Sequence, residues 1–159
     1  MAQRWEGKPL AHDVRIAIVA SRWNDLIVKN LVEGALHTIR AQGGDDGTVD
    51  IAWCPGAVEL PLVVARLARS GRYDTIIALG CVIRGGTPHF DTVVSIAASG
   101  ISRASQDSGV PVSFGVLTVD TIDQALERAG SKMGNKGSEA ALAALEMADL
   151  MRVLPGEGA

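Results

Sequence analysis

The sequence contains few cysteines, no surplus of basic residues and no long apolar segment. The two cysteines among its 159 residues, Cys54 and Cys81, have the spacing of neither a zinc site nor a disulfide framework. A formal net charge of −3 gives no general basic surface, which argues against nucleic acid as the main partner. No stretch is long enough to span a bilayer, and the opening MAQRWEGKPL has no apolar signal-peptide core. We therefore expect a reduced, cytoplasmic protein without a membrane partner.

The composition is that of a globular protein. Hydrophobic residues make up 47% of the chain and charged residues 21%, which excludes a disordered chain. A length of 159 residues suits one domain with one sizeable core. We find no internal repeat and no low-complexity linker. The sequence therefore predicts an N-terminal arm over residues 1–12 and a single domain over residues 13–159.

Apolar runs and helical stripes alternate along the chain. Continuous apolar runs predict strands at residues 14–20, 49–54, 74–83 and 111–117. Helical spacing and capping signals predict helices at about residues 28–39, 60–67, 87–106, 121–130 and 138–151. The resulting order, βαβαβαβαα, favours an α/β fold with a parallel sheet covered by helices on both faces.

Four short segments are predicted to form the binding site. In an open parallel sheet, ligands bind beyond the carboxyl ends of the strands. This rule selects residues 21–24 (SRWN), 54–59 (CPGAVE), 81–89 (CVIRGGTPH) and 114–118 (FGVLT). The first segment lacks the G-x-G-x-x-G pattern, so a dinucleotide would find no cradle there.

The third segment contains two adjacent glycines between a buried strand and a helix. Gly85 and Gly86 would let the backbone approach an anion, and Thr87 and Pro88 have the residue types of N-cap and N1. Successive amides at a helix N-terminus form a phosphate site, although a lone Gly-Gly is more often a tight turn. His89 would lie near N2, where the helix dipole favours a neutral, proton-accepting imidazole. Capping or packing of the helix end is its plainer role.

Three further side chains each have a functional and an ordinary interpretation, and a fourth, Lys136, has only an ordinary one. Trp23 could stack on a planar heterocycle or pack on the core. Glu59 could accept hydrogen bonds from ligand hydroxyls or complement a helix dipole. Arg128, expected in the last turn of a helix, could complete a phosphate site or interact with that helix's carbonyls. Lys136 lies in a Gly-Asn-Lys-Gly sequence whose default interpretation is a solvated turn.

Taken together, the motifs resemble one enzyme family. SRWN, CPGAVELP, GCVIRGGTPHFD, PVSFGVLT, QALERAG and GNKGSEAA occur in the order and spacing of the 6,7-dimethyl-8-ribityllumazine synthase family, over about residues 14–151. The resemblance implies a flavodoxin-like three-layer α/β/α sandwich with a four-stranded parallel sheet. It also implies the penultimate reaction of riboflavin biosynthesis, in which 5-amino-6-(D-ribitylamino)uracil condenses with 3,4-dihydroxy-2-butanone 4-phosphate. An imine forms, phosphate is eliminated and the ring closes with loss of water, with no metal or organic cofactor.

The resemblance implies roles for particular residues. His89 would be the catalytic proton-transfer residue. Residues that would bind the pyrimidine and its ribityl chain are Trp23, Ala57, Val58, Glu59, Cys81, Val82, Ile83, Phe114 and Lys136. Residues that would bind the phosphate are Gly85, Gly86, Thr87 and Arg128. Tryptophan at position 23 departs from the phenylalanine of many members but keeps a planar surface.

The resemblance also implies an assembly. Family members form pentamers with active sites between neighbouring subunits, and many bacterial members build a 60-subunit icosahedral shell. The short GSKMGNKG link is similar to that of shell-forming members, and residues 1–12 could add a strand to a neighbour's sheet. Riboflavin synthase is a candidate partner. Two other functions stay open: a flavin- or lumazine-binding protein without turnover, and a generic phosphate-binding α/β domain.

Overall fold

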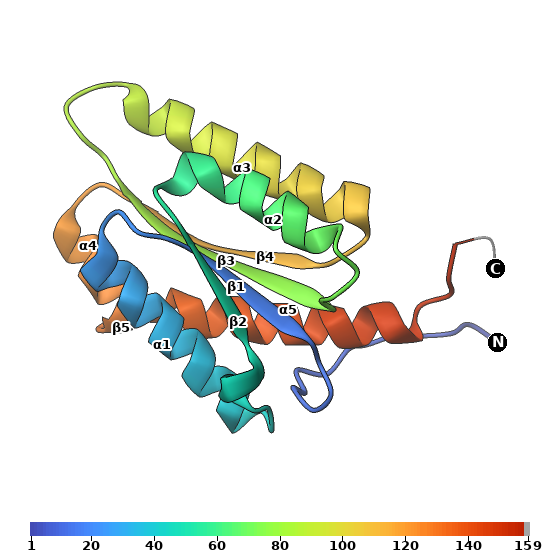
Figure 1. Ribbon diagram of the computed structural model, residues 1–159. Helices are drawn as coiled ribbons and strands as arrows, with labels where there is room; N and C mark the ends of the chain where they lie inside the picture. Colours follow the sequence, from blue (N-terminus) through green and yellow to red (C-terminus); the bar gives the residue numbers. More distant parts are fainter. Residues whose placement is uncertain (158–159) are drawn as a thin grey trace.

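The computed structural model describes residues 1–157 and has three layers (Figure 1). The middle layer is a four-stranded sheet in the order β2-β1-β3-β4, with every neighbouring pair parallel. The strands are β1 (Ile16–Ser21), β2 (Asp50–Cys54), β3 (Thr75–Ile83) and β4 (Val112–Val119). The expected parallel sheet is therefore confirmed.

Helices cover both faces of this sheet, as the sequence predicted. Figure 1 shows α2 and α3 on one face and α1 and α5 on the other. The long helices are α1 (Asp25–Ala41), α2 (Leu60–Ala68), α3 (His89–Ser108) and α5 (Lys136–Val153). The shorter elements are two 3₁₀ helices (Asp46–Thr48 and Ala57–Glu59), α4 (Ile122–Glu127), and the short strands β5 (Ala129–Ser131) and β6 (Gly134–Asn135).

Both faces of the sheet are buried because apolar residues occupy successive strand positions. Ile18 and Leu79 belong to the core beneath α1 and α5, whereas Val19 and Ala78 belong to the core beneath α2 and α3. The side chains of a strand alternate between faces, so a continuous apolar run fills two cores at once. This packing closes both faces and leaves the ends of the strands as the places where a ligand can bind.

The start of α5 is held against α1 by close packing. A side chain at Gly137 would overlap the backbone carbonyl of Leu31, so only glycine allows this approach. The Asn135 side chain caps the helix, because its Oδ1 accepts hydrogen bonds from the amides of Gly137 and Ser138 at 2.8 and 3.2 Å. These contacts fix the position of Lys136, the first residue of α5.

The sequence prediction is wrong over residues 129–135. We expected the end of a helix and a solvated link, but the structure has the antiparallel hairpin formed by β5 and β6. Gly130 (φ 106°) and Gly134 (φ 77°) adopt left-handed backbone conformations that permit these turns. The amide of Lys136 donates to the carbonyl of Arg128 at 2.8 Å, which closes the hairpin. Lys136 therefore does not lie in a solvated turn.

The start of α3 also differs by one residue from the expectation. Pro88 (φ −70°, ψ 3°) occupies the N-cap position, so His89 is the first helical residue rather than the second. Thr87 lies one residue before the cap, and no side chain caps this helix. Offsets of one or two residues also occur at β1 and β4, as is usual at the ends of elements.

The N-terminal residues form no helix or strand before β1. The amide of Lys8 donates to the Asp149 carboxylate at 2.8 Å, which ties this segment to α5. The N-terminal segment and the described residues after α5, 154–157, lie at the end of the molecule opposite the loop between β3 and α3 (Figure 1). Within residues 1–157, no helix is both long and apolar enough to cross a membrane.

Candidate active site

The segment after β1 is tied to both neighbouring strand ends. The amide of Trp23 donates to the Pro55 carbonyl at 3.0 Å, and the Asn24 side-chain amide donates to the Cys81 carbonyl at 3.0 Å. Asn24 has a left-handed backbone (φ 62°) and precedes α1 without capping it. Its side chain therefore joins the Trp23 segment to the end of β3, a role that the sequence did not reveal.

The Trp23 ring lies directly on the backbone of Gly56. A Cβ atom at position 56 would be 2.6 Å from Cε3 of Trp23 and 3.3 Å from Oε2 of Glu59, so a larger residue would displace the ring. Trp23 is nevertheless 65% exposed, which leaves much of the indole uncovered. An aromatic ring that is supported from below and open to solvent favours the stacking interpretation over core packing. In the sequence, the glycine of the CPGAVE segment is the one feature that could have indicated that a ring packs on this backbone.

Glu59 supplies a buried acceptor beside this ring. Its Oε2 atom is buried and has no hydrogen-bond partner among the described residues. Burial raises the pKa of the neighbouring Cys54 thiol, and the negative charge of Glu59 raises it further. An unpaired buried carboxylate oxygen is costly unless a ligand donates to it. Of the two residues before Glu59, Ala57 is buried and Val58 is exposed.

The end of β3 offers main-chain groups along one edge. β3 pairs with β1 only as far as Leu79, but it pairs with β4 as far as Ile83. Alternate residues beyond Leu79 thus direct backbone groups past the end of β1, and Asn24 uses one of them at Cys81. Burial raises the pKa of the Cys81 thiol to about 11, so this thiol is protonated and non-nucleophilic near neutral pH. Val82 and Ile83 are half-buried.

The two glycines after β3 have no explanation within the fold. Neither Gly85 nor Gly86 has a positive φ, and a Cβ atom at either position would meet nothing within 4 Å. The backbone hydrogen bonds formed outside helices and strands in residues 1–157 include none from the amides of Gly85, Gly86 or Thr87. The loop thus presents free amides with no side chain to cover them, and exposed His89 follows at the start of α3.

Three other candidates lie around a separate cleft beside β4. This cleft has a volume of about 510 Å³ and is lined by β4, α4 and the start of α5. Its lining residues are Phe114, Val116, Leu117, Thr118, Val119, Gln124, Arg128, Met133, Lys136 and Glu139. No other residue predicted for the site lines the cleft, although its residues Leu117–Val119 pair with Cys81–Ile83 at the end of β3.

Arg128 and Lys136 bring two cations to the cleft, and each lies near a carboxylate: Glu127 is 3.9 Å from Arg128, and Glu139 lines the cleft beside Lys136. Arg128 directly follows α4, and its Nη1 donates to the Gln124 carbonyl at 3.2 Å. This contact matches the expected interaction with the carboxyl end of the helix. The Lys136 ammonium lies 3.7 Å from the Glu139 carboxylate. Both cations are half-buried in the cleft lining, and the hydrogen bond from the Lys136 amide to the Arg128 carbonyl brings their backbones together.

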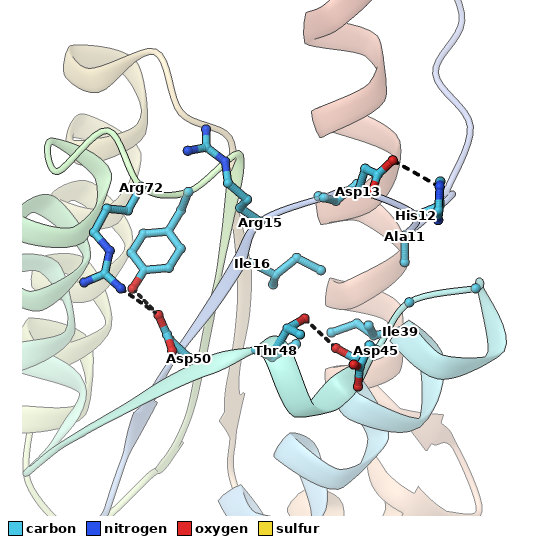
Figure 2. Close-up of a pocket in the computed structure, with 15 residues that line it drawn as sticks. Ala11, His12, Asp13, Arg15, Ile16, Ile39, Asp45, Thr48, Asp50 and Arg72 are labelled. Carbon is cyan, nitrogen blue, oxygen red and sulfur yellow. Dashed lines mark hydrogen bonds and ion pairs between the residues drawn. The ribbon is translucent and has the colours of Figure 1, made fainter.

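A hollow of similar volume, about 520 Å³, lies at the opposite end of the sheet. Its charged groups are paired with each other: Asp50 accepts from the Tyr73 hydroxyl at 2.6 Å and contacts Arg72 at 3.4 Å. Figure 2 shows Arg72 directed toward Asp50, and His12 directed toward Asp13, 3.0 Å away. These contacts satisfy the polar groups from within the protein, so this hollow is not the candidate active site. No group of three or more possible metal-ligating side chains occurs in residues 1–157.

Comparison with known proteins gives a consistent result. The family model described as 6,7-dimethyl-8-ribityllumazine synthase matches residues 13–152. The chain is 52% identical over 152 residues to the 6,7-dimethyl-8-ribityllumazine synthase of Chlorobium phaeovibrioides, covering 96% of this chain and 98% of the relative. It is 53% identical over 147 residues to the protein of the same name from Chlorobium luteolum, covering 92% and 95%.

Proposed function

The chain belongs to the 6,7-dimethyl-8-ribityllumazine synthase family, and we propose that the carboxyl end of its sheet forms the active site. The enzyme is a transferase that condenses 5-amino-6-(D-ribitylamino)uracil with 3,4-dihydroxy-2-butanone 4-phosphate in riboflavin biosynthesis. This activity replaces the two alternatives left open by the sequence, a binding protein without turnover and a generic phosphate-binding domain.

The open loop after β3 carries the proposal. The amides of Gly85, Gly86 and Thr87 bind the phosphate of the four-carbon substrate, because no protein group competes for them and no side chain blocks the approach. Arg128 completes the phosphate site with its planar guanidinium. Charge-assisted hydrogen bonds of this kind stabilise the phosphate as it leaves and gains negative charge.

The pyrimidine substrate binds opposite this loop. Its ring stacks on the exposed face of Trp23, and its ribityl hydroxyls donate to the unpaired Oε2 of Glu59. The main chain of residues 57–58 lies beside the ribityl chain, and the free edge of residues 81–83 supplies hydrogen bonds to the ring. The supporting observations are the Gly56 contact beneath the indole and the early end of the pairing between β3 and β1.

The chemistry follows from holding an amine and a ketone in one pocket. Well-oriented reactants can recover roughly 7–11 kcal/mol of the barrier in favourable cases. The amine attacks the C2 ketone to form an imine with loss of water. C3 then loses a proton and phosphate departs from C4, two carbons from the imine carbon. His89 transfers protons during these steps, because it follows the phosphate loop directly and is exposed as the first residue of α3.

We further propose that the complete site forms between two copies of the chain. Phe114, Arg128 and Lys136 line a cleft that contains none of the other candidates, so a neighbouring subunit supplies them. Phe114 would cover the pyrimidine, and Lys136 would lie near the edge of the uracil. The assembly proposed from the resemblance is a cytoplasmic pentamer, further packed into a 60-subunit shell. In it, residues 1–12 form the arm that joins a neighbour, and riboflavin synthase is a candidate partner.

The first test is kinetic and addresses the glycine loop. Purified protein is mixed with both substrates, and lumazine absorbance is followed. Gly86→Val should raise KM for the phosphate substrate at least about tenfold, since each blocked bond to a charged group is worth about 1.5–3 kcal/mol. KM for the pyrimidine should change little. Gly156→Val is the control, because position 156 is equally open and lies near the C-terminus. An unchanged KM for the phosphate substrate in Gly86→Val would remove the proposed phosphate site.

The second test addresses the division between subunits. Gly86→Val and Arg128→Ala are made separately and then co-expressed, with light scattering used to verify assembly. Random mixing joins two intact halves at about one site in four, so about a quarter of wild-type activity should return. Activity no higher than the mean of the two variants would mean that each chain holds a complete site.

A further inference from the structure

Arg84 is the cation immediately before the glycine loop, yet its side chain contacts protein groups. Its Nε donates to Oδ1 of Asp120 at 2.8 Å, and its Nη1 lies 3.8 Å from the Asp91 carboxylate. Its guanidinium carbon is 4.3 Å from the centre of the Phe90 ring, within cation–π distance. Asp120, Asp91 and the Phe90 ring therefore all contact the Arg84 guanidinium.

These partners lie on both sides of the loop. Phe90 and Asp91 belong to the first turn of α3, where the loop ends, and Asp120 follows β4. The amide of Arg84 also donates to the Val119 carbonyl at 2.8 Å, where the loop begins. The Arg84 side chain thus connects the beginning of the loop with its end and with the neighbouring strand.

The loop has little other support. Side-chain positions at Gly85 and Gly86 face open space, and residues 84–89 are all exposed. Glycine loses more conformational freedom on ordering than any other residue. If the loop were ordered only when phosphate binds, this loss of conformational entropy would weaken binding. A group that already holds the two ends of the loop at a fixed separation would avoid that loss.

We propose that Arg84 is a positioning residue for the phosphate site, holding the loop in its binding geometry without contacting phosphate. The inference rests on the proposed function, which assigns phosphate to this loop. The Arg84, Asp120 and Asp91 side chains are 47%, 64% and 71% exposed, so any one ion pair would contribute little alone. A planar guanidinium can satisfy two carboxylates and a ring together, which a lysine ammonium cannot do in the same geometry.

The test separates the two substrates. Arg84→Gln should raise KM for the phosphate substrate roughly five- to tenfold, because small displacements of a binding group cost much of its effect. KM for the pyrimidine should stay within about twofold. Arg84→Lys keeps the positive charge but lacks the planar guanidinium, so its KM for the phosphate substrate should lie between those of the wild type and Arg84→Gln. An equal rise in both KM values, accompanied by a lower Tm, would mean a general structural role and would overturn the proposal.

Asp120→Asn distinguishes a positioning residue from a direct phosphate ligand. If Arg84 acts by holding the loop through its contacts with Asp120 and the first turn of α3, losing Asp120 should weaken phosphate binding about two- to threefold. The effect is modest because an exposed charged partner contributes little. If Arg84 binds phosphate itself, freeing it from Asp120 should leave binding unchanged or tighter, and the proposal would fail. Asp123→Asn is the matched control: it removes the same charge from the exposed first turn of α4. It should not weaken phosphate binding.

Inorganic phosphate separates failure of this inference from failure of the proposed function. Phosphate should inhibit the wild-type enzyme competitively against the phosphate substrate, with an inhibition constant that rises in Arg84→Gln. Inhibition that is equal in both proteins would overturn the role of Arg84 and leave the phosphate site in place. A wild-type enzyme that phosphate does not inhibit competitively would overturn both.

Discussion

The two ends of the sheet carry hollows of nearly equal volume, about 520 Å³ at the amino end and about 510 Å³ beside β4 toward the carboxyl end. At the amino end the polar groups satisfy each other, as Asp50 does with Tyr73 and Arg72. The carboxyl end instead has free loop amides, an exposed indole and the unpaired oxygen of Glu59. Volume does not distinguish the two ends. The pairing of the groups around each site does: no residue lining the amino-end hollow has an unpaired buried side-chain oxygen or nitrogen, whereas Glu59 at the carboxyl end has one. The other such atom in residues 1–157, Ser113 Oγ, lies near the start of β4 and outside both sites. A native protein retains unpaired groups where a ligand will pair with them.

The asymmetry has a structural origin in the parallel sheet. A helix that follows a strand of a parallel sheet begins at the carboxyl end of the sheet, so its N-terminal amides, which have no partner within the helix, lie at that end. The α3 helix begins there at His89, just after the glycine loop. The amino end receives helix C-termini, as α1 does at Ala41. The carboxyl end is thus the place where a phosphate is favoured electrostatically.

The largest difference between the two ends should appear in KM for the phosphate substrate when an arginine at each end is replaced by alanine. Arg128→Ala should raise KM for the phosphate substrate by roughly ten- to a hundredfold, since hydrogen bonds to charged groups contribute about 1.5–3 kcal/mol. KM for the pyrimidine should change much less. Arg72→Ala, at the amino-end hollow, should leave both constants unchanged. Equal losses for both substrates in Arg128→Ala, or a kinetic effect of Arg72→Ala, would break the comparison.

A smaller effect is expected at the aromatic surface. Trp23→Ala should raise KM for the pyrimidine roughly two- to tenfold, because aromatic stacking contributes about 0.5–1.5 kcal/mol beyond area burial. KM for the phosphate substrate serves as the internal reference. Trp23→Phe keeps a planar ring and should stay close to wild type. If Trp23→Phe were as impaired as Trp23→Ala, the indole would be acting through something other than stacking.

The smallest effect concerns stability at the amino end and its pH dependence. Burial raises the pKa of Asp74, but hydrogen bonds from Arg15 and the charges of Arg15 and Arg152 outweigh it, so the pKa falls below 3.8. A lowered folded-state pKa stabilises the protein above about pH 4, and this contribution is lost as the pH falls through the folded value.

Asp74→Asn should therefore lower the free energy of unfolding by roughly 1 kcal/mol near pH 7, with the deficit shrinking below pH 4. Urea titrations at pH 7 and pH 3 measure this change. Both KM values should be unaffected, because Asp74 lies at the amino end. A deficit that persists at pH 3, or a change in KM, would contradict this assignment.

Much of the fold and the location of the site could be predicted from local sequence patterns. Apolar runs such as residues 74–83 indicated strands buried on both faces, and their alternation with helical stripes indicated the parallel sheet. The capping signal at the start of the predicted helix over residues 121–130 is confirmed, because the Thr121 hydroxyl accepts from the Gln124 amide at 3.1 Å. The β5–β6 hairpin was missed, because its turns depend on Gly130 and Gly134 in a segment with no strand-like alternation.

The remaining features of the site depend on contacts between distant residues. The Asn24 bond to Cys81 joins residues 57 positions apart, and the Arg84 pair with Asp120 joins residues 36 apart. The sequence patterns around Asn24 and Arg84 carry no sign of these partners. A helix-start asparagine predicts a cap, and an arginine before a phosphate loop predicts a phosphate ligand. In the structure the Asn24 side chain caps no helix, and the Arg84 guanidinium pairs with Asp120 and Asp91.

The sequence alone determined the family and the α/β architecture and led to the proposal of which end of the sheet binds ligands, because periodicity, caps and motifs are encoded by residues near one another in the chain. Only the tertiary structure decided which groups stay unpaired, and it alone gathered Phe114, Arg128 and Lys136 around one cleft. Hydrogen-bond satisfaction and shared clefts are properties of residues brought together by packing, so no local pattern can specify them.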